Sequence, residues 1–418
     1  MQRIPADPPR RSFRPHVAID GLCLSERRGG IGAYTLHLAK ALLARGDVRL
    51  TCFLPAESAT AAGELLQHGA TVVPVRWSLD RASEQVLWEN WHLRRKVRRL
   101  RADLYFGPNF ALPPRLGLPS IVTLHDFAVD HFPHTKSRQF RVYLGHMIRR
   151  AVRRADMLLT DSQAVADDLI TRYEPGVERV RVAPLAPVSS LVRQSDEVIR
   201  EHAQRFEIED GYILHASNFD DRKNVEALAI AFDQVCRRHD RPDRLVLAGG
   251  HPWTGNIGKR LRARGLSDRV RFTGYVPTDT LAALYSGATF FAFPSLYEGF
   301  GLPLLEAMRC ETPVLTSRGG ALAEVAGDAA RLVDPTASAA LEEGIEELLL
   351  DPELRTTLVE RGRRRMQEFS WERCAEETFS AMELVLRSRG RWPVTIGVPE
   401  LPRSVRTDRR QPTSTSPR

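Results

Sequence analysis

The sequence lacks any apolar segment close to the roughly 20 residues that a membrane-spanning helix needs. Its first residues, MQRIPADPPRRSFRPH, also lack the apolar stretch of a signal peptide. Both absences argue against secretion and against insertion into a bilayer. We therefore expect a cytoplasmic protein.

Cysteine is scarce, with five residues in a chain of 418. The cysteines lie far apart and without paired spacing, which argues against a zinc cluster, a redox pair and a disulfide framework. The histidines likewise show no spacing typical of metal ligands. We expect no metal site and five reduced thiols, at Cys23, Cys52, Cys236, Cys310 and Cys374.

The formal net charge of +8 at first favours a nucleic-acid-binding protein. However, residues 1–14 carry +3 and residues 387–418 carry +6, so the tails hold the excess. These polar tails offer too little apolar surface to offset the entropy of ordering, and we expect both to be disordered. The body between them is basic over residues 15–190 (+7) and acidic over residues 191–386 (−8). A near-neutral body without interleaved aromatic residues argues against a nucleic-acid partner.

Short apolar runs rich in β-branched residues alternate with segments of helical periodicity along the chain. This alternation is typical of parallel βαβ units, and the chain is longer than a single core usually organises. We predict an α/β protein of two doubly wound parallel-sheet (Rossmann-like) domains. Their predicted bounds are residues 15–190 and 211–368, with a linker over 191–210 and a helix over 369–386 that packs back on the first domain.

Thirteen strands are predicted, seven in the first domain and six in the second. Helices are predicted between them, over residues 31–45, 83–101, 138–154 and 163–173 in the first half and near 224–238, 278–286 and 302–309 in the second. Ligands of such sheets bind at the carboxyl ends of strands. Function is therefore expected in the loops that follow strands.

Two of these loops suit a phosphate. In the first, Gly30 and Gly32 precede or open a helix, where bare backbone lets a phosphate approach N–H groups at the positive helix end; a plain tight turn is the alternative. In the second, Arg222 and Lys223 stand just before a helix, which favours an unneutralised anion site. The alternative is a solvated surface on which Asp220 and Asp221 are the local partners of the two cations.

The stretch SLYEGFGLPLLEAMRC, residues 295–310, carries Glu298 and Glu306 with two glycines and a proline between them. Pro303 suits the first helical turn, so a helix should begin near Leu302 and leave Glu298 in the preceding loop. The segment then offers backbone donors for phosphate or sugar oxygens, flanked by two acceptors for hydroxyl groups. A capping glutamate and a solvated glutamate would explain each acid separately but not the glycines between them.

A histidine and an aspartate, His125 and Asp126, follow the predicted strand PSIVTL. A His-Asp pair at this place can hold a sugar hydroxyl or share a proton. A histidine satisfied by its own neighbours is the alternative.

Taken in order, several motifs resemble the GT-B-fold retaining glycosyltransferases of family four (glycosyl transferases group 1), and especially their bacterial mannosyltransferase-like branch. The motifs are GGIGAYTLHLAKAL, TLHDF, RRADMLLTDSQAVADDL, DDRKNVEAL, RFTGYVPTDTLAALYSGATFFAFPSLYEGFGLPLLEAMRCETPVLTS and LAEVAGDAARLVDP. The longest of them carries the Glu-x7-Glu signature of the family. The resemblance covers about residues 15–385.

The resemblance implies roles for the residues of the second domain. Glu298 would hold hydroxyls of the donor sugar, and Glu306 would hold the ribose hydroxyls of the nucleotide. Lys223 and Arg222 would neutralise the donor diphosphate. The backbone amides that contact the sugar or the β-phosphate would be those of Phe300, Gly301 and Leu302.

It implies roles in the first domain as well. Gly30 and Gly32 would close over the diphosphate, and His125, next to Asp126, would contact the transferred sugar near the acceptor. The chain departs from the family at Ser217, where many members have an arginine, so that neutralisation would rest more heavily on the arginine before the lysine.

The reaction implied is retaining and metal-independent transfer of a hexose, with mannose from GDP-mannose expected, to a glycan, a lipid-linked or a small-molecule acceptor. The leaving phosphate would accept the proton, and no cofactor or protein nucleophile is needed. A UDP-sugar donor, or a noncatalytic sugar-nucleotide binding protein, remains open. Basic faces over residues 93–100 and 141–154 could rest on anionic lipid at the inner face of the membrane, or could simply be solvated.

Overall fold

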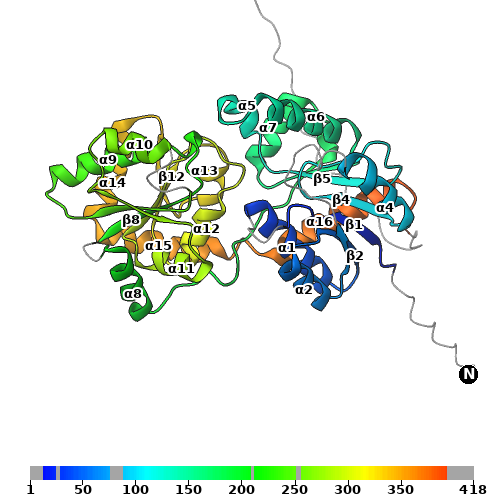
Figure 1. Cartoon of the computed structure of the whole chain (residues 1–418), viewed down its shortest axis with the longest axis horizontal. Coiled ribbons are helices and arrows are strands. Elements are labelled where there is room, and N and C mark those ends of the chain that lie inside the picture. Colours follow the sequence, from blue (N-terminus) through cyan, green and yellow to red (C-terminus); the bar gives the residue numbers. More distant parts are fainter. Residues whose placement is uncertain (1–12, 25–28, 76–87, 209–210, 251–255, 393–418) are drawn as a thin grey trace, which may run out of the picture.

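The computed structural model describes residues 13–24, 29–75, 88–208, 211–250 and 256–392. Most of the two tails predicted to be disordered lies outside the described residues, and so does the beginning of the helix predicted over 83–101. The prediction of disorder is wrong for residues 387–392, because Arg387 and Ser388 end the last helix and the Trp392 ring packs edge-on against Phe379 with 6.1 Å between ring centres. Figure 1 shows two lobes, each a sheet flanked by helices. Its element labels are used below.

The N-terminal domain contains a sheet of seven parallel strands in the order β3-β2-β1-β4-β5-β6-β7. Most strand residues are buried, as expected where helices cover both faces of a parallel sheet. The strand order reverses between β1 and β4, which is where ligands of doubly wound sheets bind. The strands are β1 His16–Asp20, β2 Arg49–Pro55, β3 Thr71–Val75, β4 Leu104–Gly107, β5 Ser120–Leu124, β6 Met157–Thr160 and β7 Val180–Val182.

The helices of this domain largely match the predicted periodicity. They are α1 Gly30–Ala44, α2 Ala59–Gln67, α4 Leu93–Arg99, α5 Ala128–His131, α6 Arg138–Arg154 and α7 Gln163–Tyr173. Ser137 caps α6 and Ser162 caps α7, each by accepting a hydrogen bond from a backbone N–H of the first turn.

The C-terminal domain repeats this plan with six parallel strands in the order β10-β9-β8-β11-β12-β13. The strands are β8 Tyr212–Ala216, β9 Arg244–Ala248, β10 Val270–Gly274, β11 Phe290–Phe293, β12 Val314–Ser317 and β13 Arg331–Val333. The helices are α8 Asp196–Phe206, α9 Val225–Arg238, α10 Asn256–Ala263, α11 Thr278–Gly287, α12 Leu302–Arg309, α13 Gly320–Ala326, α14 Ser338–Leu350 and α15 Pro352–Met366. The segment expected as a linker thus contains α8, which packs against α11.

The last helix, α16 Trp371–Ser388, crosses to the N-terminal domain and lies against α1 (Figure 1). The Trp371 ring stacks on His37 of α1, and its indole N–H donates to the carbonyl oxygen of Pro187. One apolar cluster continues through both domains and includes buried side chains of α1, β11 and α16. Within the described residues, no helix combines the length and the apolar character needed to cross a membrane.

Candidate active site

The loops that follow β8 and β11 meet at one edge of the second sheet. These strands are parallel neighbours, so their carboxyl ends lie side by side. The N–H of Leu296 donates to the carbonyl oxygen of Arg222 at 2.7 Å and ties the two loops together. Asn224, with φ +59°, ends the short helical turn that carries Arg222 and Lys223 and leads into α9. Both cations thereby face Glu298.

Glu298 is the shared partner of both cations. The Lys223 Nζ donates to its Oε1 at 2.5 Å, and the Arg222 Nη1 donates to its Oε2 at 2.7 Å. The three side chains are between 9% and 14% exposed, so little solvent screens them. Asp220 adds a contact to the Arg222 Nε at 3.2 Å. The expectation of an unneutralised anion site is therefore wrong for this conformation, because two neighbouring loops supply the counter-ions.

Burial and ion pairing shift the pKa values of this cluster. Burial raises the pKa of Glu298, but Lys223 and Arg222 lower it by more, so the pKa of this carboxyl lies below its ordinary value. Burial lowers the pKa of Lys223, and Glu298 only partly offsets this. The ammonium group also lies 4.7 Å from the centre of the Phe293 ring. A dianionic ligand would therefore meet two partly desolvated cations that share the Glu298 carboxylate, one of which also contacts Asp220.

The second glutamate, Glu306, lies on α12 and is not part of this cluster. Its Oε2 accepts a hydrogen bond from the Tyr285 hydroxyl at 3.1 Å, and burial raises its pKa to about 7. Helix α12 begins at Leu302, as Pro303 predicted, after Gly301 with φ +108°. The first N–H groups of a helix have no partner within it, so they are available to an anion.

The Phe300 ring belongs to the core. It packs edge-on against Phe369, with 5.8 Å between ring centres, and is 5% exposed. Only the backbone of Phe300 is therefore suited to meet a ligand.

His125 is fully hydrogen-bonded inside the N-terminal domain. Its Nδ1 lies 2.7 Å from Oδ2 of Asp161, and its Nε2 lies 2.7 Å from the carbonyl oxygen of Pro108. Burial lowers the pKa of His125, but Asp161 and the Pro108 carbonyl raise it by more, which favours an imidazolium that donates both bonds. The ring thus has no free nitrogen for a sugar in this conformation. The expected sugar contact through the ring is replaced by a satisfied histidine.

Asp126 differs from its neighbour because it lines an open cavity. Its Oδ1 accepts a hydrogen bond from the N–H of Ala128 at 2.9 Å. The cavity, of about 360 Å³, lies between the domains, and Arg222 and Asp220 line it from the opposite side. Beyond these groups much of its wall is apolar, and α6 contributes Phe140, Leu144 and Met147 to it, although Lys136 and Asn218 also line the cavity. The cavity therefore has a polar end next to the Arg222–Glu298 pair and a more apolar wall along α6.

The glycine loop reaches the same cavity through Ile31, which lies between Gly30 and Gly32 at the start of α1. A Cβ on Gly30 would meet no atom within 4 Å, so nothing in the protein itself requires glycine there. Gly32 is buried in the first turn. Residues 25–28 of this loop lie outside the described residues.

Gly299 brings the two domains into contact beside Glu298. A Cβ on Gly299 would lie 1.9 Å from the carbonyl oxygen of His125, so only glycine fits. The carbonyl oxygen of Gly299 accepts a hydrogen bond from the Ser162 hydroxyl at 2.7 Å. The sequence predicted bare backbone for a ligand here. The structure instead shows bare backbone against the other domain.

Four further side chains were not identified from the sequence. Asp161 holds His125, and Tyr297 donates to Asp168 across the domain boundary at 3.0 Å. Glu324 of α13 accepts hydrogen bonds from the first two N–H groups of α7 at 2.8 and 2.9 Å. Asp161 directly follows β6, so the reasoning that placed function after strands could have found it. The other three depend on how the domains meet, which no local pattern encodes.

Two family models and several curated relatives match this chain. The family model "Glycosyltransferase Family 4" matches residues 28–186, and the family model "Glycosyl transferases group 1" matches residues 198–365. O-antigen chain mannosyltransferase B of Escherichia coli is 30% identical over 373 residues, which covers 85% of this chain and 96% of that protein. MMP alpha-(1->4)-mannosyltransferase of Mycolicibacterium hassiacum is 31% identical over 288 residues, covering 64% of this chain and 66% of that protein.

A solved structure shares the fold. HepE of Anabaena, in complex with UDP and glucose, aligns with a TM-score of 0.69 at 19% identity. The alignment covers 89% of this chain and 100% of HepE. At this identity the likeness shows the two-domain architecture.

Proposed function

We propose a specific reaction for this chain, which belongs to the GT-B glycosyltransferases of family 4: retaining, metal-independent transfer of mannose from GDP-mannose to a hydroxyl group of an acceptor. The names of two relatives, both mannosyltransferases, support the sugar. GDP is the nucleotide that we propose to carry this sugar.

The observation that carries the proposal is the Lys223–Glu298–Arg222 cluster. The Glu298 carboxylate bridges both cations, and Asp220 adds a second acid beside Arg222. A donor diphosphate would take over Lys223 and Arg222, since it offers more charge and more oxygens than a carboxylate. This exchange would release Glu298 to accept hydrogen bonds from hexose hydroxyls. The donor thus creates its own sugar site.

The remaining donor contacts follow from the same geometry. The N–H groups at the start of α12, near Gly301 and Leu302, would bind phosphate or sugar oxygens. Glu306, one helical turn further, would accept hydrogen bonds from the ribose hydroxyls when ionised. Gly30 and Gly32 would close over the diphosphate from the N-terminal domain, where the space beside Gly30 is open.

Transfer would proceed on one face of the sugar. The acceptor oxygen bonds to the anomeric carbon as the bond from that carbon to the phosphate oxygen breaks, and the departing phosphate takes the acceptor proton. Lys223, Arg222 and the α12 amides would stabilise the charge that develops on the phosphate. Asp126 would orient the acceptor hydroxyl from the opposite wall of the cavity. Contact between the domains at Gly299 would keep water away from the donor.

The acceptor would be a glycan or a lipid-linked glycan, bound with its apolar part along α6. The basic faces of α4 and α6 would meet anionic lipid, placing the enzyme at the cytoplasmic face of a membrane. On α6, Met147 and Ile148 are buried while Arg149 and Arg153 are exposed, which leaves the charges on the outer face.

The test is a thermal-shift panel of GDP-mannose, UDP-glucose and ADP-glucose, followed by transfer assays with the donor that binds. A donor at about 100 times its Kd stabilises the folded state by about 2.7 kcal/mol. We expect GDP-mannose to raise the melting temperature and to release GDP when acceptor is added. A shift with a UDP-sugar alone would overturn the donor assignment, and no shift with any donor would overturn the site.

A further inference from the structure

A second cavity lies on the N-terminal domain, away from the domain boundary. It has a volume of about 440 Å³, within the roughly 300–1,000 Å³ range of small-molecule sites. Ser120, the first residue of β5, and Asp156, just before β6, line it. The candidate active site follows the carboxyl ends of these strands, so the cavity belongs to the opposite edge of the sheet. The proposed reaction does not use it.

The cavity carries an excess of positive charge. Four arginines line it, namely Arg115, Arg154, Arg389 and Arg391, against a single acid, Asp156. The acid is already engaged: its Oδ2 accepts from the backbone N–H of Ser120 at 2.8 Å, and its Oδ1 accepts from Nε of Arg389 at 2.7 Å. Within the described residues no carboxylate pairs with the other three arginines.

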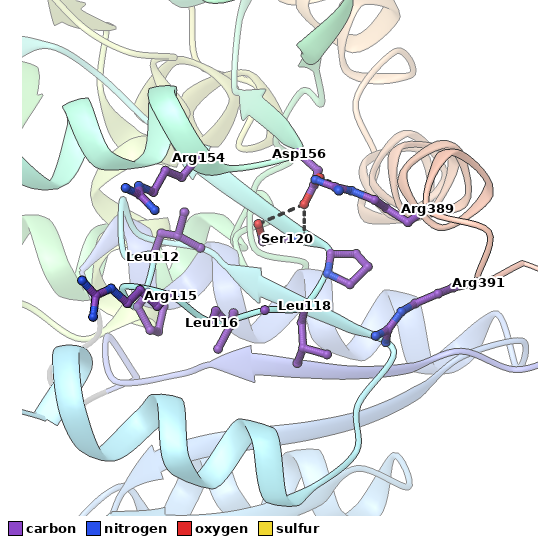
Figure 2. Close-up of a pocket in the computed structure, with 12 residues that line it drawn as sticks. Leu112, Arg115, Leu116, Leu118, Ser120, Arg154, Asp156, Arg389 and Arg391 are labelled. Atoms are coloured by element: carbon purple, nitrogen blue, oxygen red, sulfur yellow. Dashed lines mark hydrogen bonds and ion pairs between the residues drawn. The ribbon is translucent and has the colours of Figure 1, made fainter.

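The arginines surround an apolar floor. In Figure 2, Leu112, Leu116 and Leu118 lie between Arg115 and Arg154 on one side and the two arginines that follow α16 on the other. Leu112 and Leu116 are each 5% exposed, so the core holds most of each side chain and a small part of each faces the cavity. The site therefore offers cations at its rim and an apolar base, which suits an anion that carries an apolar stem.

A neighbouring hollow extends the same surface. It has a volume of about 310 Å³ and shares Arg115 and Arg154 with the first cavity. Its other lining residues include Arg149, Arg150 and Arg153 of α6. The two adjoining cavities are both lined by arginines and share two of them. Together they form a larger positively charged surface than a single exposed arginine would. Guanidinium groups bind phosphate through paired hydrogen bonds, whereas a monovalent carboxylate would leave most of these donors unused.

We propose that this cavity, defined by Arg115, Arg154 and Arg391 around Leu112, Leu116 and Leu118, is a binding site for a phosphate monoester or diester with an apolar substituent. The phosphate binds the three arginines and the substituent lies on the leucines. A soluble phosphate ester and the headgroup of an anionic phospholipid share this chemistry. The site is separate from the donor site, so the proposal does not depend on the donor assignment.

Hexyl phosphate is the soluble probe, and its binding to the full chain is measured by isothermal titration calorimetry at constant ionic strength. Hexanol and inorganic phosphate serve as probes for each half of the interaction. The test variant is Arg115→Gln/Arg154→Gln, at two exposed positions that form no ion pair within the described residues, with Arg391→Gln as a second, milder variant. The matched control is Lys259→Gln/Arg364→Gln, which makes the same change in charge at exposed positions of the other domain.

We expect hexyl phosphate to bind the wild type more tightly than either half-probe. Binding should weaken by about tenfold or more in the double arginine variant, which loses charge-assisted hydrogen bonds, and should be unchanged in the control. Vesicles of phosphatidylglycerol, compared with phosphatidylcholine, form the second arm. Loss of vesicle binding in the double variant, with no binding of soluble hexyl phosphate to the wild type, would assign the site to a lipid headgroup.

Equal binding of both probes to the wild type and the double variant would overturn the proposal. So would the absence of binding in both arms. Displacement of hexyl phosphate by GDP would also overturn it, because the probe would then occupy the donor site. A failure of the proposed donor, by contrast, would leave all of these measurements unchanged.

Discussion

The Lys223 ammonium group lies 2.5 Å from Oε1 of Glu298, although the two residues are 75 positions apart in the chain. Each of them was expected to bind a different part of the donor. In the structure they bind each other, with Arg222 on the second carboxylate oxygen. In the proposed binding mode the donor breaks this largely buried ion pair, so substitutions of Glu298 and Lys223 should have different effects on donor binding.

Replacing Glu298 by glutamine should separate donor binding from transfer. The substitution keeps the shape but removes the negative charge, so Lys223 and Arg222 lose their internal counter-ion. We expect the donor Kd to stay the same or to decrease several-fold, while kcat falls by about 100-fold or more because the sugar loses its charged acceptor. Calorimetry with the donor and steady-state kinetics check the two effects.

Lys223→Ala provides the contrast, since it should weaken donor binding as well as kcat. Lys259→Ala, at an exposed position of the same domain, is the matched control. Glu298→Gln with wild-type kcat, or with donor affinity lost as severely as in Lys223→Ala, would contradict the exchange of partners.

Donor affinity should depend on pH through Glu306. Burial raises its pKa to about 7, and the ribose hydroxyls need an ionised carboxylate as acceptor. Affinity should therefore fall as the pH drops from 8 to 6, and Glu306→Gln should remove this dependence. Calorimetric titrations of wild type and variant at several pH values provide the measurement.

Ionisation of Glu306 should affect stability in the opposite sense to donor affinity. Because the folded-state pKa lies above the ordinary value of 4.5, the folded protein binds more protons between these values, and stability falls as the pH rises through them. At pH 8 the variant Glu306→Gln should be more stable than the wild type by about 1–3 kcal/mol, and near pH 4.5 the difference should vanish. An unfolding difference independent of pH would argue against the raised pKa.

Gly299→Ala should force the domains apart. Its Cβ would collide with the His125 carbonyl oxygen, whereas Gly319→Ala adds a Cβ in open space and is the matched control. We expect transfer to fall by about 100-fold or more while the isolated donor contacts of the C-terminal domain remain, so that donor Kd changes much less than kcat. Small-angle scattering should show a more extended particle for Gly299→Ala. An unchanged particle with normal kcat would show that this contact is dispensable.

His125→Ala distinguishes a structural histidine from a sugar-binding one. The substitution leaves Asp161 buried without its counter-ion, and breaking such a pair costs about 3–5 kcal/mol. The pKa of His125 is raised by its partners and the pKa of Asp161 is raised by burial. The contribution of the ion pair is therefore lost as the pH rises through the raised pKa of His125, and it is also lost as the pH falls through the raised pKa of Asp161. Urea unfolding of wild type and variant at several pH values measures it. If His125→Ala kept wild-type stability and lost only transfer, the result would favour direct contact between His125 and the sugar.

The sequence predicted the elements well because their signals are local. All thirteen strands occur in the predicted order, and α12 begins at Leu302 because a proline in the first helical turn and a preceding glycine with positive φ mark that boundary. The same alternation of strands and helices occurs in both halves of the chain, so two parallel sheets could be predicted from the sequence.

What the sequence could not show was the pairing of the site residues. Glu298 meets Lys223 because β8 and β11 are neighbours in the sheet, and strand order is a property of the whole domain. His125 is likewise held by Asp161 from the next strand of the sheet. Gly299 contacts the other domain, and that contact depends on the domain arrangement. Local patterns selected the candidate site residues but could not show which of them neutralise one another.

The most direct test of the proposed donor site is a crystal structure of the protein with GDP-mannose. The account predicts that the diphosphate lies within hydrogen-bond distance of Lys223 and Arg222, that Glu298 has left both cations for the mannose hydroxyls, and that Glu306 contacts the ribose. A bound donor elsewhere, with the ion pairs of Glu298 still intact, would contradict it.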